Sequence, residues 1–332
     1  MPEPSPSPKR RGRLLRCGAA FVVLLAVAGY LAVQYITGGA GGPGCKVVSG
    51  KGDGATYEFS PEQAVNAATI TAVGTARGLP ERAVTIALAT ALQESALRNI
   101  DHGDRDSLGL FQQRPSQGWG TERQIMDPIY SAGMFYDHLV EVPGYTRLPL
   151  TVAAQRVQRS GFPQAYAKHE PDATLLAAAL TGRAEATLTC AGRPDATRVT
   201  GPDAVRSALV RDFGQDAMQE TGAEVSGAAT PRPTVTAETS GRTVTVPVTE
   251  EGSGDGRATR ERGWQLAHWA VANASRLHIE RVSYAGREWV AGTTDSRWRA
   301  ADEAPDGGSA DGSAGDGKNG AGADAVRIVT AQ

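Results

Sequence analysis

The sequence is poor in aromatic residues and in cysteine, and it has no excess of charge of either sign. Only 6% of its 332 residues are Phe, Trp or Tyr, and three are cysteine. With 34 basic and 36 acidic residues the formal net charge is −2. The chain therefore offers no general electrostatic attraction to nucleic acid, and nucleic-acid binding is disfavoured. The length suits about two domains.

The N-terminal pattern of charge and hydropathy is that of an exported chain. Residues 1–16 contain five basic residues and one acid, and an apolar run over 17–36 follows. A run of about 20 apolar residues matches the hydrocarbon core of a bilayer. The basic segment should stay in the cytoplasm, which predicts one transmembrane helix at the cell membrane with the bulk of the chain outside. The alternative is signal-peptide cleavage and secretion, which the length of the run disfavours.

Cysteine usage fits this topology. Cys17 lies at the cytoplasmic edge of the apolar run, whereas Cys45 and Cys190 both lie outside. An even pair in an oxidising compartment predicts one disulfide, with two free thiols as the alternative. Two isolated cysteines do not suggest a metal site.

Apolar periodicity and helix caps predict a mostly helical segment over residues 55–190. A Gly-rich stretch, 37–54, is expected to be a flexible tether. Ser60-Pro61 then has the pattern of a helix cap followed by proline in the first turn. Helices are expected from Pro61 to before Gly78, and over 81–97, 128–140, 151–159 and 163–181.

The remaining residues predict a helix and linker over 191–233 and a small α+β accessory domain over 234–332. Hairpin signals surround Ser240-Gly241 and Ala285-Gly286. A Trp-containing helix is expected over 258–276 and a last strand over 326–330. Residues 302–324, rich in Gly, Asp and Ser, are expected to form a disordered loop.

Glu94 is the first unusual position. It comes at the end of a stretch, 81–97, that is apolar on most of its circumference and should be buried. Burial raises the pKa of a carboxyl group, which suits a general acid in glycoside cleavage. The alternative is a helix-end carboxylate that faces solvent or pairs with Arg98.

Three elements in order resemble the lysozyme-like superfamily, most closely lytic transglycosylases and goose-type lysozymes. The first is Gln93-Glu94-Ser95, and the second is the segment 106–113 with the sequence DSLGLFQQ. The third is the segment 152–161 followed by Tyr166, where Gln158-Arg159 stands in place of the family's usual Tyr-Asn. The resemblance covers about residues 55–190 and implies a mainly α lysozyme-like domain, followed here by the small α+β domain.

The resemblance also implies roles for individual residues. Glu94 would be the catalytic acid, and Ser95 would orient its carboxylate or the sugar. Tyr166 would stack on a sugar ring, although core packing is an equal alternative; for Trp119 core packing is favoured. The residues expected to line the cleft and bind N-acetyl groups are Ser107, Gln112 and Gln113.

A hydrolase would need a second carboxylate, for which Asp101, Asp104 and Asp106 are candidates. A lytic transglycosylase needs none, because a hydroxyl of the substrate attacks. The three aspartates lack the order of an EF-hand and can equally be a solvated acidic loop. No metal and no cofactor are expected.

These patterns favour an enzyme that cleaves the β-1,4 bond between N-acetylmuramic acid and N-acetylglucosamine in peptidoglycan. One alternative is a non-catalytic peptidoglycan-binding or wall-assembly protein that retains the cleft. Another is a regulatory anchor whose partner binds the C-terminal module. That module resembles small domains appended to secreted actinobacterial wall proteins, which implies an accessory role.

Overall fold

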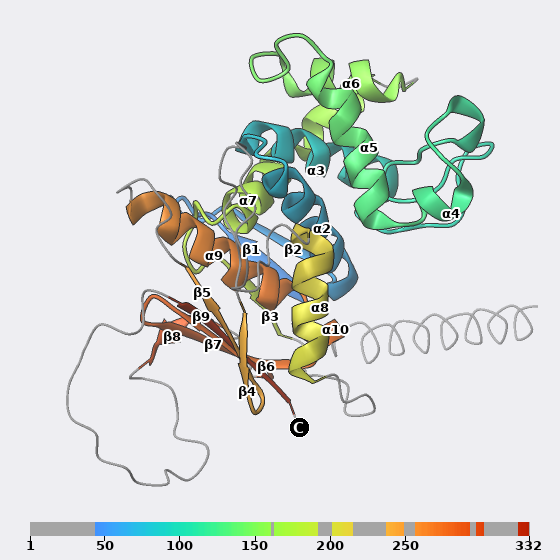
Figure 1. Cartoon of the computed structure of the whole chain (residues 1–332). Helices are drawn as coiled ribbons and strands as arrows, with labels where there is room; N and C mark the ends of the chain where they lie inside the picture. Colours follow the sequence, from blue (N-terminus) through green and yellow to red (C-terminus); the bar gives the residue numbers. More distant parts are fainter. Residues whose placement is uncertain are drawn as a thin grey trace, which may run out of the picture. The chain divides into compact units, whose positions relative to one another are not determined.

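A computed structural model describes residues 44–160, 163–191, 201–214, 237–248, 256–292, 297–301 and 325–331 (Figure 1). Local sequence signals set its first helices. Ser60 caps α2 (Pro61–Ala76) in a capping box with Gln63, and Asp127 caps α5 (Pro128–Val140). The other helical elements of this part are α3 (Glu81–Ser95), η1 (Pro115–Gln117), α4 (Glu122–Ile125), α6 (Leu150–Gln158), η2 (Pro163–His169) and α7 (Glu170–Leu180).

A three-stranded antiparallel sheet lies among these helices. Its strands are β1 (Cys45–Val48), β2 (Thr56–Phe59) and β3 (Leu188–Cys190), in the order β2-β1-β3. The register sets Cys45 directly opposite Cys190, and the two form a disulfide. The predicted disulfide is therefore confirmed.

The C-terminal part contains a six-stranded antiparallel sheet in the order β4-β5-β9-β6-β7-β8. The predicted hairpins around Ser240-Gly241 and Ala285-Gly286 are confirmed as β4-β5 and β6-β7. The helices are α8 (Pro202–Phe213), α9 (Gly256–Ala272) and α10 (Ala274–Leu277), and the strands are β4 (Glu238–Ser240), β5 (Thr243–Pro247), β6 (Ile279–Tyr284), β7 (Arg287–Val290), β8 (Arg299–Ala300) and β9 (Ala325–Thr330).

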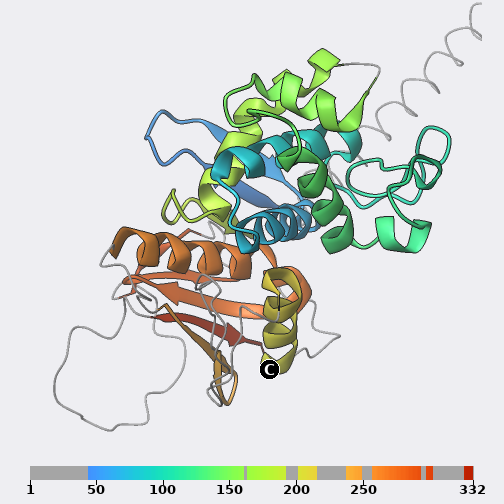
Figure 2. The same cartoon turned by 45° about the horizontal axis from the view of Figure 1, so that its top comes forward.

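Helix α9 lies between the six-stranded sheet and the N-terminal helices (Figure 2). Its buried His268 donates from Nδ1 to the Ala179 carbonyl (2.7 Å) and accepts at Nε2 from the Thr187 amide (3.3 Å). Burial lowers the pKa of His268 to about 4, so the ring is neutral at pH 7. Trp298 donates to the Leu188 carbonyl at 2.9 Å. These contacts join both parts through one core, and Pro43–Gln332 form a single compact unit.

The prediction of a mainly α domain followed by a small α+β domain is wrong. Helices and antiparallel sheets occur in both parts of the chain, and the first sheet includes β1, which lies in the stretch 37–54 predicted as a tether. Strands of three or four residues are too short to show an alternating pattern, and β1 pairs with β3 across more than a hundred residues. The periodicity of apolar residues along the sequence gives no information about pairing between strands so far apart.

Two other predictions concern residues that the structure does not describe. The expected transmembrane helix, 17–36, and the expected disordered loop, 302–324, both lie outside the described residues. Among the residues that are described, no helix has the length and apolar character needed to cross a membrane.

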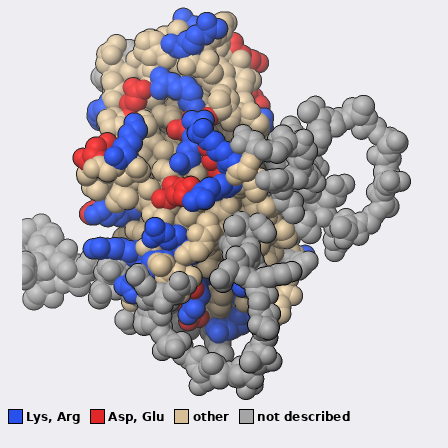
Figure 3. Space-filling view, turned by 90° about the vertical axis from the view of Figure 1, so that its left-hand side faces the viewer, with Lys and Arg blue, Asp and Glu red and all other residues tan. Residues whose placement is uncertain are grey.

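The surface carries charges of both signs. Figure 3 shows one face on which basic side chains outnumber acidic ones and several lie beside an acidic group. Many of the described charges are paired, for example Arg183 with Glu81 at 2.9 Å and Arg82 with Glu170 at 2.8 Å. Such partly exposed surface pairs each contribute roughly 0–1 kcal/mol to stability.

Candidate active site

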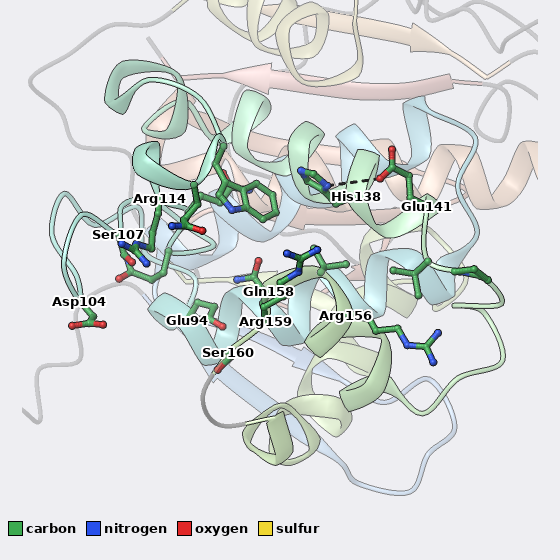
Figure 4. Close-up of a pocket in the computed structure, with 17 residues that line it drawn as sticks. Glu94, Asp104, Ser107, Arg114, His138, Glu141, Arg156, Gln158, Arg159 and Ser160 are labelled. Atoms are coloured by element: carbon green, nitrogen blue, oxygen red, sulfur yellow. Dashed lines mark ion pairs between the residues drawn. The ribbon is translucent and has the colours of Figure 1, made fainter.

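A cleft of about 740 Å³ opens beside the end of α3 (Figure 4). Its walls come from the loop between α3 and α4, from the end of α5, and from the end of α6. Most of its lining is polar or charged. The lining residues include Glu94, Asp104, Ser107, Gln112, Gln113, Arg114, Trp119, His138, Glu141, Arg156, Gln158, Arg159 and Ser160.

Glu94 reaches the cleft because α3 ends beside it. Helix α3 is buried along nearly its whole length, and it stops where Ala96 (φ 53°) and Leu97 (φ 59°) adopt the left-handed conformation. The Ala96 amide caps the helix by donating to the carbonyls of Ala91 and Leu92. The carboxyl group of Glu94 is therefore attached to a helix in the apolar interior and faces a polar cleft.

The surroundings of Glu94 shift its pKa upward. Burial is the largest cause and raises the pKa, while hydrogen bonds from Tyr166 and Gln158 lower it without cancelling the effect of burial. The phenol of Tyr166 donates to Oε1 of Glu94 at 2.6 Å. A carboxyl group in this setting keeps its proton to higher pH than a solvated glutamate does, as a general acid requires.

Tyr166 is fully buried and lies against Glu94 rather than in the open cleft. It comes from η2, 72 positions further along the chain. Burial, and then the charge of Glu94, raise the pKa of its phenol, whereas a hydrogen bond with Ser160 lowers it. Tyr166 therefore keeps its proton and acts as a fixed hydrogen-bond donor to the carboxylate. Its position fits an orienting role and leaves no face for a sugar to stack on.

Ser95 and Gln113 are buried and bind backbone groups. The Ser95 hydroxyl donates to the carbonyls of Ala91 (3.1 Å) and Leu110 (2.8 Å). The Gln113 amide donates to the Ser131 carbonyl at 2.9 Å. The two side chains thus fasten the loop after α3 to α3 and α5.

Ser107 and Gln112 also line the cleft. Ser107 is buried, and its amide donates to the Asp104 carbonyl at 3.1 Å. Gln112 has a left-handed backbone (φ 48°), and its side chain donates to the Gly109 carbonyl at 3.3 Å. Both residues shape the loop wall next to Glu94.

The three candidate aspartates occupy different places. Asp101 is exposed, contacts His102 at 3.0 Å and does not line the cleft. Asp106 accepts from the Ser116 amide (2.9 Å) and from Arg114 (2.7 Å), and hydrogen bonds with Ser116, then with Arg114, hold its pKa well below the usual range. Asp104 alone of the three lines the cleft, at its rim, with a side chain that is 96% exposed.

The structure adds residues that sequence reasoning did not assign to the site, namely Arg156, His138 and Glu141. His138 and Glu141 lie one turn apart at the end of α5, 4.0 Å from each other (Figure 4). Gln158 and Arg159 also line the cleft, and Gln158 donates to the Phe111 carbonyl at 2.7 Å. The only sequence signal for this side of the cleft is that Gln158-Arg159 replaces the Tyr-Asn pair usual in the lysozyme-like proteins that the segment resembles.

Comparison with known proteins finds a match in the C-terminal part of the chain. Residues 205–312 match a family model described as VldE, C-terminal domain. A search of curated proteins finds no match to the chain. The matched segment is less than half of the chain and contains none of the residues that line the cleft, so the chemistry of the cleft rests on its own geometry.

Proposed function

We propose that this protein cleaves the glycan strands of peptidoglycan at the β-1,4 bond between N-acetylmuramic acid and N-acetylglucosamine. The observation that carries the proposal is Glu94, a carboxyl group with a raised pKa, fixed by Tyr166 and set in a polar cleft. The resemblance of the segments around Glu94 and over 106–113 to lytic transglycosylases and goose-type lysozymes names the substrate class.

In the proposed reaction Glu94 first acts as general acid. Its proton passes to the glycosidic oxygen as the bond to the anomeric carbon breaks, and the carboxylate that forms is stabilised by the hydrogen bond from Tyr166. The same carboxylate then accepts a proton from the attacking nucleophile. Donation from Tyr166 to Oε1 leaves the other carboxyl oxygen to exchange the proton with substrate.

The aspartates favour the transglycosylase route over hydrolysis. Asp106 is held by Arg114, Asp101 does not line the cleft, and Asp104 is almost fully solvated at the rim. None of the three is enclosed beside Glu94, as a nucleophile or a water-activating base would be. Glu141, which also lines the cleft, is 78% exposed and lies 4.0 Å from His138. We therefore propose that a hydroxyl of the muramic acid residue attacks its own anomeric carbon and yields an anhydro end.

We also propose that the chain acts outside the cytoplasm. The disulfide between Cys45 and Cys190 closes a segment that contains the whole cleft. Structural disulfides form and persist in oxidising compartments, where peptidoglycan is also found.

The test is digestion of purified peptidoglycan by the full chain, with mass spectrometry of the soluble products. We expect anhydro-muramic ends, and a loss of at least about 100-fold in rate for Glu94→Gln. The matched control is Glu62→Gln, in the first turn of α2 and outside the cleft, which should digest like the wild type. Equal digestion by Glu94→Gln would overturn the assignment of the acid. Binding to the wall without release of products would instead support a non-catalytic wall-binding protein.

A further inference from the structure

A second cavity, of about 330 Å³, shares no lining residue with the Glu94 cleft. It is bordered by α2, by the turn from α4 to α5, by α8 and by α10. It thus lies where the N-terminal helices meet the C-terminal part of the chain. Junctions of this kind are frequent places for small-molecule sites, and the volume is at the lower end of their range.

Three arginines from three separate helices line this cavity: Arg123 of α4, Arg211 of α8 and Arg276 of α10. Among the described residues only Arg211 of the three has a carboxylate partner, the buried Asp212, at 2.7 Å. Within the described parts of the chain no carboxylate lies within ion-pair distance of Arg123 or Arg276. Two guanidinium groups at this cavity therefore have no ion-pair partner among the described residues.

The acidic residues near the cavity are already engaged. Asp127, the one acid that lines it among the described residues, is the cap of α5 and accepts from the amides of Ile129 (2.8 Å) and Tyr130 (3.4 Å). Asp212 is enclosed by its own partners and accepts from Trp269 at 2.8 Å and from Thr69 at 3.3 Å. Within the described residues neither forms an ion pair with Arg123 or Arg276, and the lining holds three guanidinium groups against one carboxylate.

Arg276 is exposed, and a second guanidinium group, that of Arg211, acts on it. Desolvation lowers its pKa, repulsion by Arg211 lowers it further, and only Asp212 acts in the opposite direction. One of its nitrogens donates to Asn273 at 2.6 Å, while a guanidinium has five N–H donors. An anion in the cavity would use the remaining donors and remove the repulsion between the two arginines.

The cavity also has an apolar side, formed by Val65, Met126, Pro128 and Ile129. A free ion would leave this side in contact with water only, whereas an organic group attached to the anion would cover it. Three guanidinium groups that come from different helices suit the several oxygens of a phosphate better than the two oxygens of one planar carboxylate.

We propose that this cavity is a second ligand site, which binds the phosphate group of a small phosphate ester on Arg123, Arg211 and Arg276. The organic part of the ester lies against Val65, Met126 and Ile129. This site is separate from the proposed glycan cleavage, and its test does not require that activity.

The test is isothermal titration calorimetry of the full chain with glycerol 3-phosphate, inorganic phosphate and acetate. We expect saturable binding of glycerol 3-phosphate in the millimolar range or tighter, and no saturable binding of acetate. The double variant Arg123→Gln/Arg276→Gln should bind at least about tenfold more weakly. Both residues are exposed, and neither has a carboxylate partner in the part of the chain that the structure describes. The double variant is therefore expected to fold, which its melting temperature will check.

The matched control is Arg206→Gln, on α8 like Arg211 but outside the cavity. It should bind glycerol 3-phosphate like the wild type. Tighter binding of the ester than of inorganic phosphate supports an organic phosphate as the ligand. Equal binding of the two supports the phosphate site with free phosphate as its source. The proposal is overturned if neither compound binds saturably, or if a folded double variant binds as tightly as the wild type.

Discussion

Glu94 and Asp106 are both carboxylic acids near one cleft, a dozen positions apart in the sequence, yet their pKa values shift in opposite directions. Glu94 is attached to a buried helix, and desolvation raises its pKa. Asp106 is on a solvated loop, and hydrogen bonds with Ser116 and Arg114 lower its pKa. The element that carries an acid, rather than its distance along the chain from the site, therefore decides the direction in which its pKa shifts.

The largest effect that tests this comparison is expected from Tyr166→Phe. The variant loses the hydrogen bond to Glu94, and hydrogen bonds to charged groups contribute roughly 1.5–3 kcal/mol. We expect kcat/KM for glycan cleavage to fall about 10- to 100-fold. Because that bond lowers the pKa of Glu94, its loss should move the alkaline limb of the pH–rate profile to higher pH. A fall in rate with no movement of this limb would assign Tyr166 to packing alone.

The next effect is expected from Glu94→Gln, which should raise the free energy of unfolding although it lowers the rate of cleavage. Since folding raises the pKa of Glu94, its contribution to stability is fully present below the unfolded-state pKa and is lost as the pH rises through the folded-state value. Glu94→Gln removes the charge that is costly to bury. We expect the variant to be more stable than the wild type at pH 8 by about 1 kcal/mol, with a smaller difference at pH 4, by denaturant unfolding. A destabilised variant at pH 8 would contradict the desolvation of Glu94.

The smallest effect is expected from Asp106→Asn. Because folding lowers the pKa of Asp106, its contribution to stability is present above the unfolded-state value and is lost as the pH falls through the folded-state value. The variant should have a slightly lower melting temperature at pH 7, with the difference disappearing in acid. Glycan cleavage should change less than about tenfold, below the range for loss of a general acid or base.

Asp101→Asn is the control for this prediction, because Asp101 is exposed and lies outside the cleft lining. It should alter neither melting temperature nor cleavage. A loss of cleavage in Asp106→Asn as large as that in Glu94→Gln would make Asp106 the second carboxylate of a hydrolase, and the contrast between the two acids would then need a different explanation.

Features set by neighbouring residues could be predicted from the sequence. The cap at Asp127 and the apolar pattern after it predict the helix over Pro128–Val140 with its observed bounds. The Ala285-Gly286 turn has positive φ at both positions, as a two-residue hairpin of this kind requires. Such signals act within a few residues and do not depend on the tertiary fold.

Apart from the disulfide between Cys45 and Cys190, features that depend on distant residues could not be predicted. The sheet β2-β1-β3 unites strands from both ends of a long segment, and no local pattern connects them. The contact between Tyr166 and Glu94 spans 72 positions. Ser95 has the same identity whether it faces a sugar or the Leu110 carbonyl, which it binds. In each case the partner, and not the residue type, determines the role.

The disulfide between β1 and β3 also has a mechanical consequence. It joins Cys45 to Cys190 at the two ends of the segment that contains every residue of the cleft. Tension applied to the chain before Cys45 and after Cys190 would be carried by this covalent bond and would bypass the residues in between. The segment between the two cysteines would then bear no force. The cleft would keep its shape while noncovalent contacts outside this segment are pulled apart.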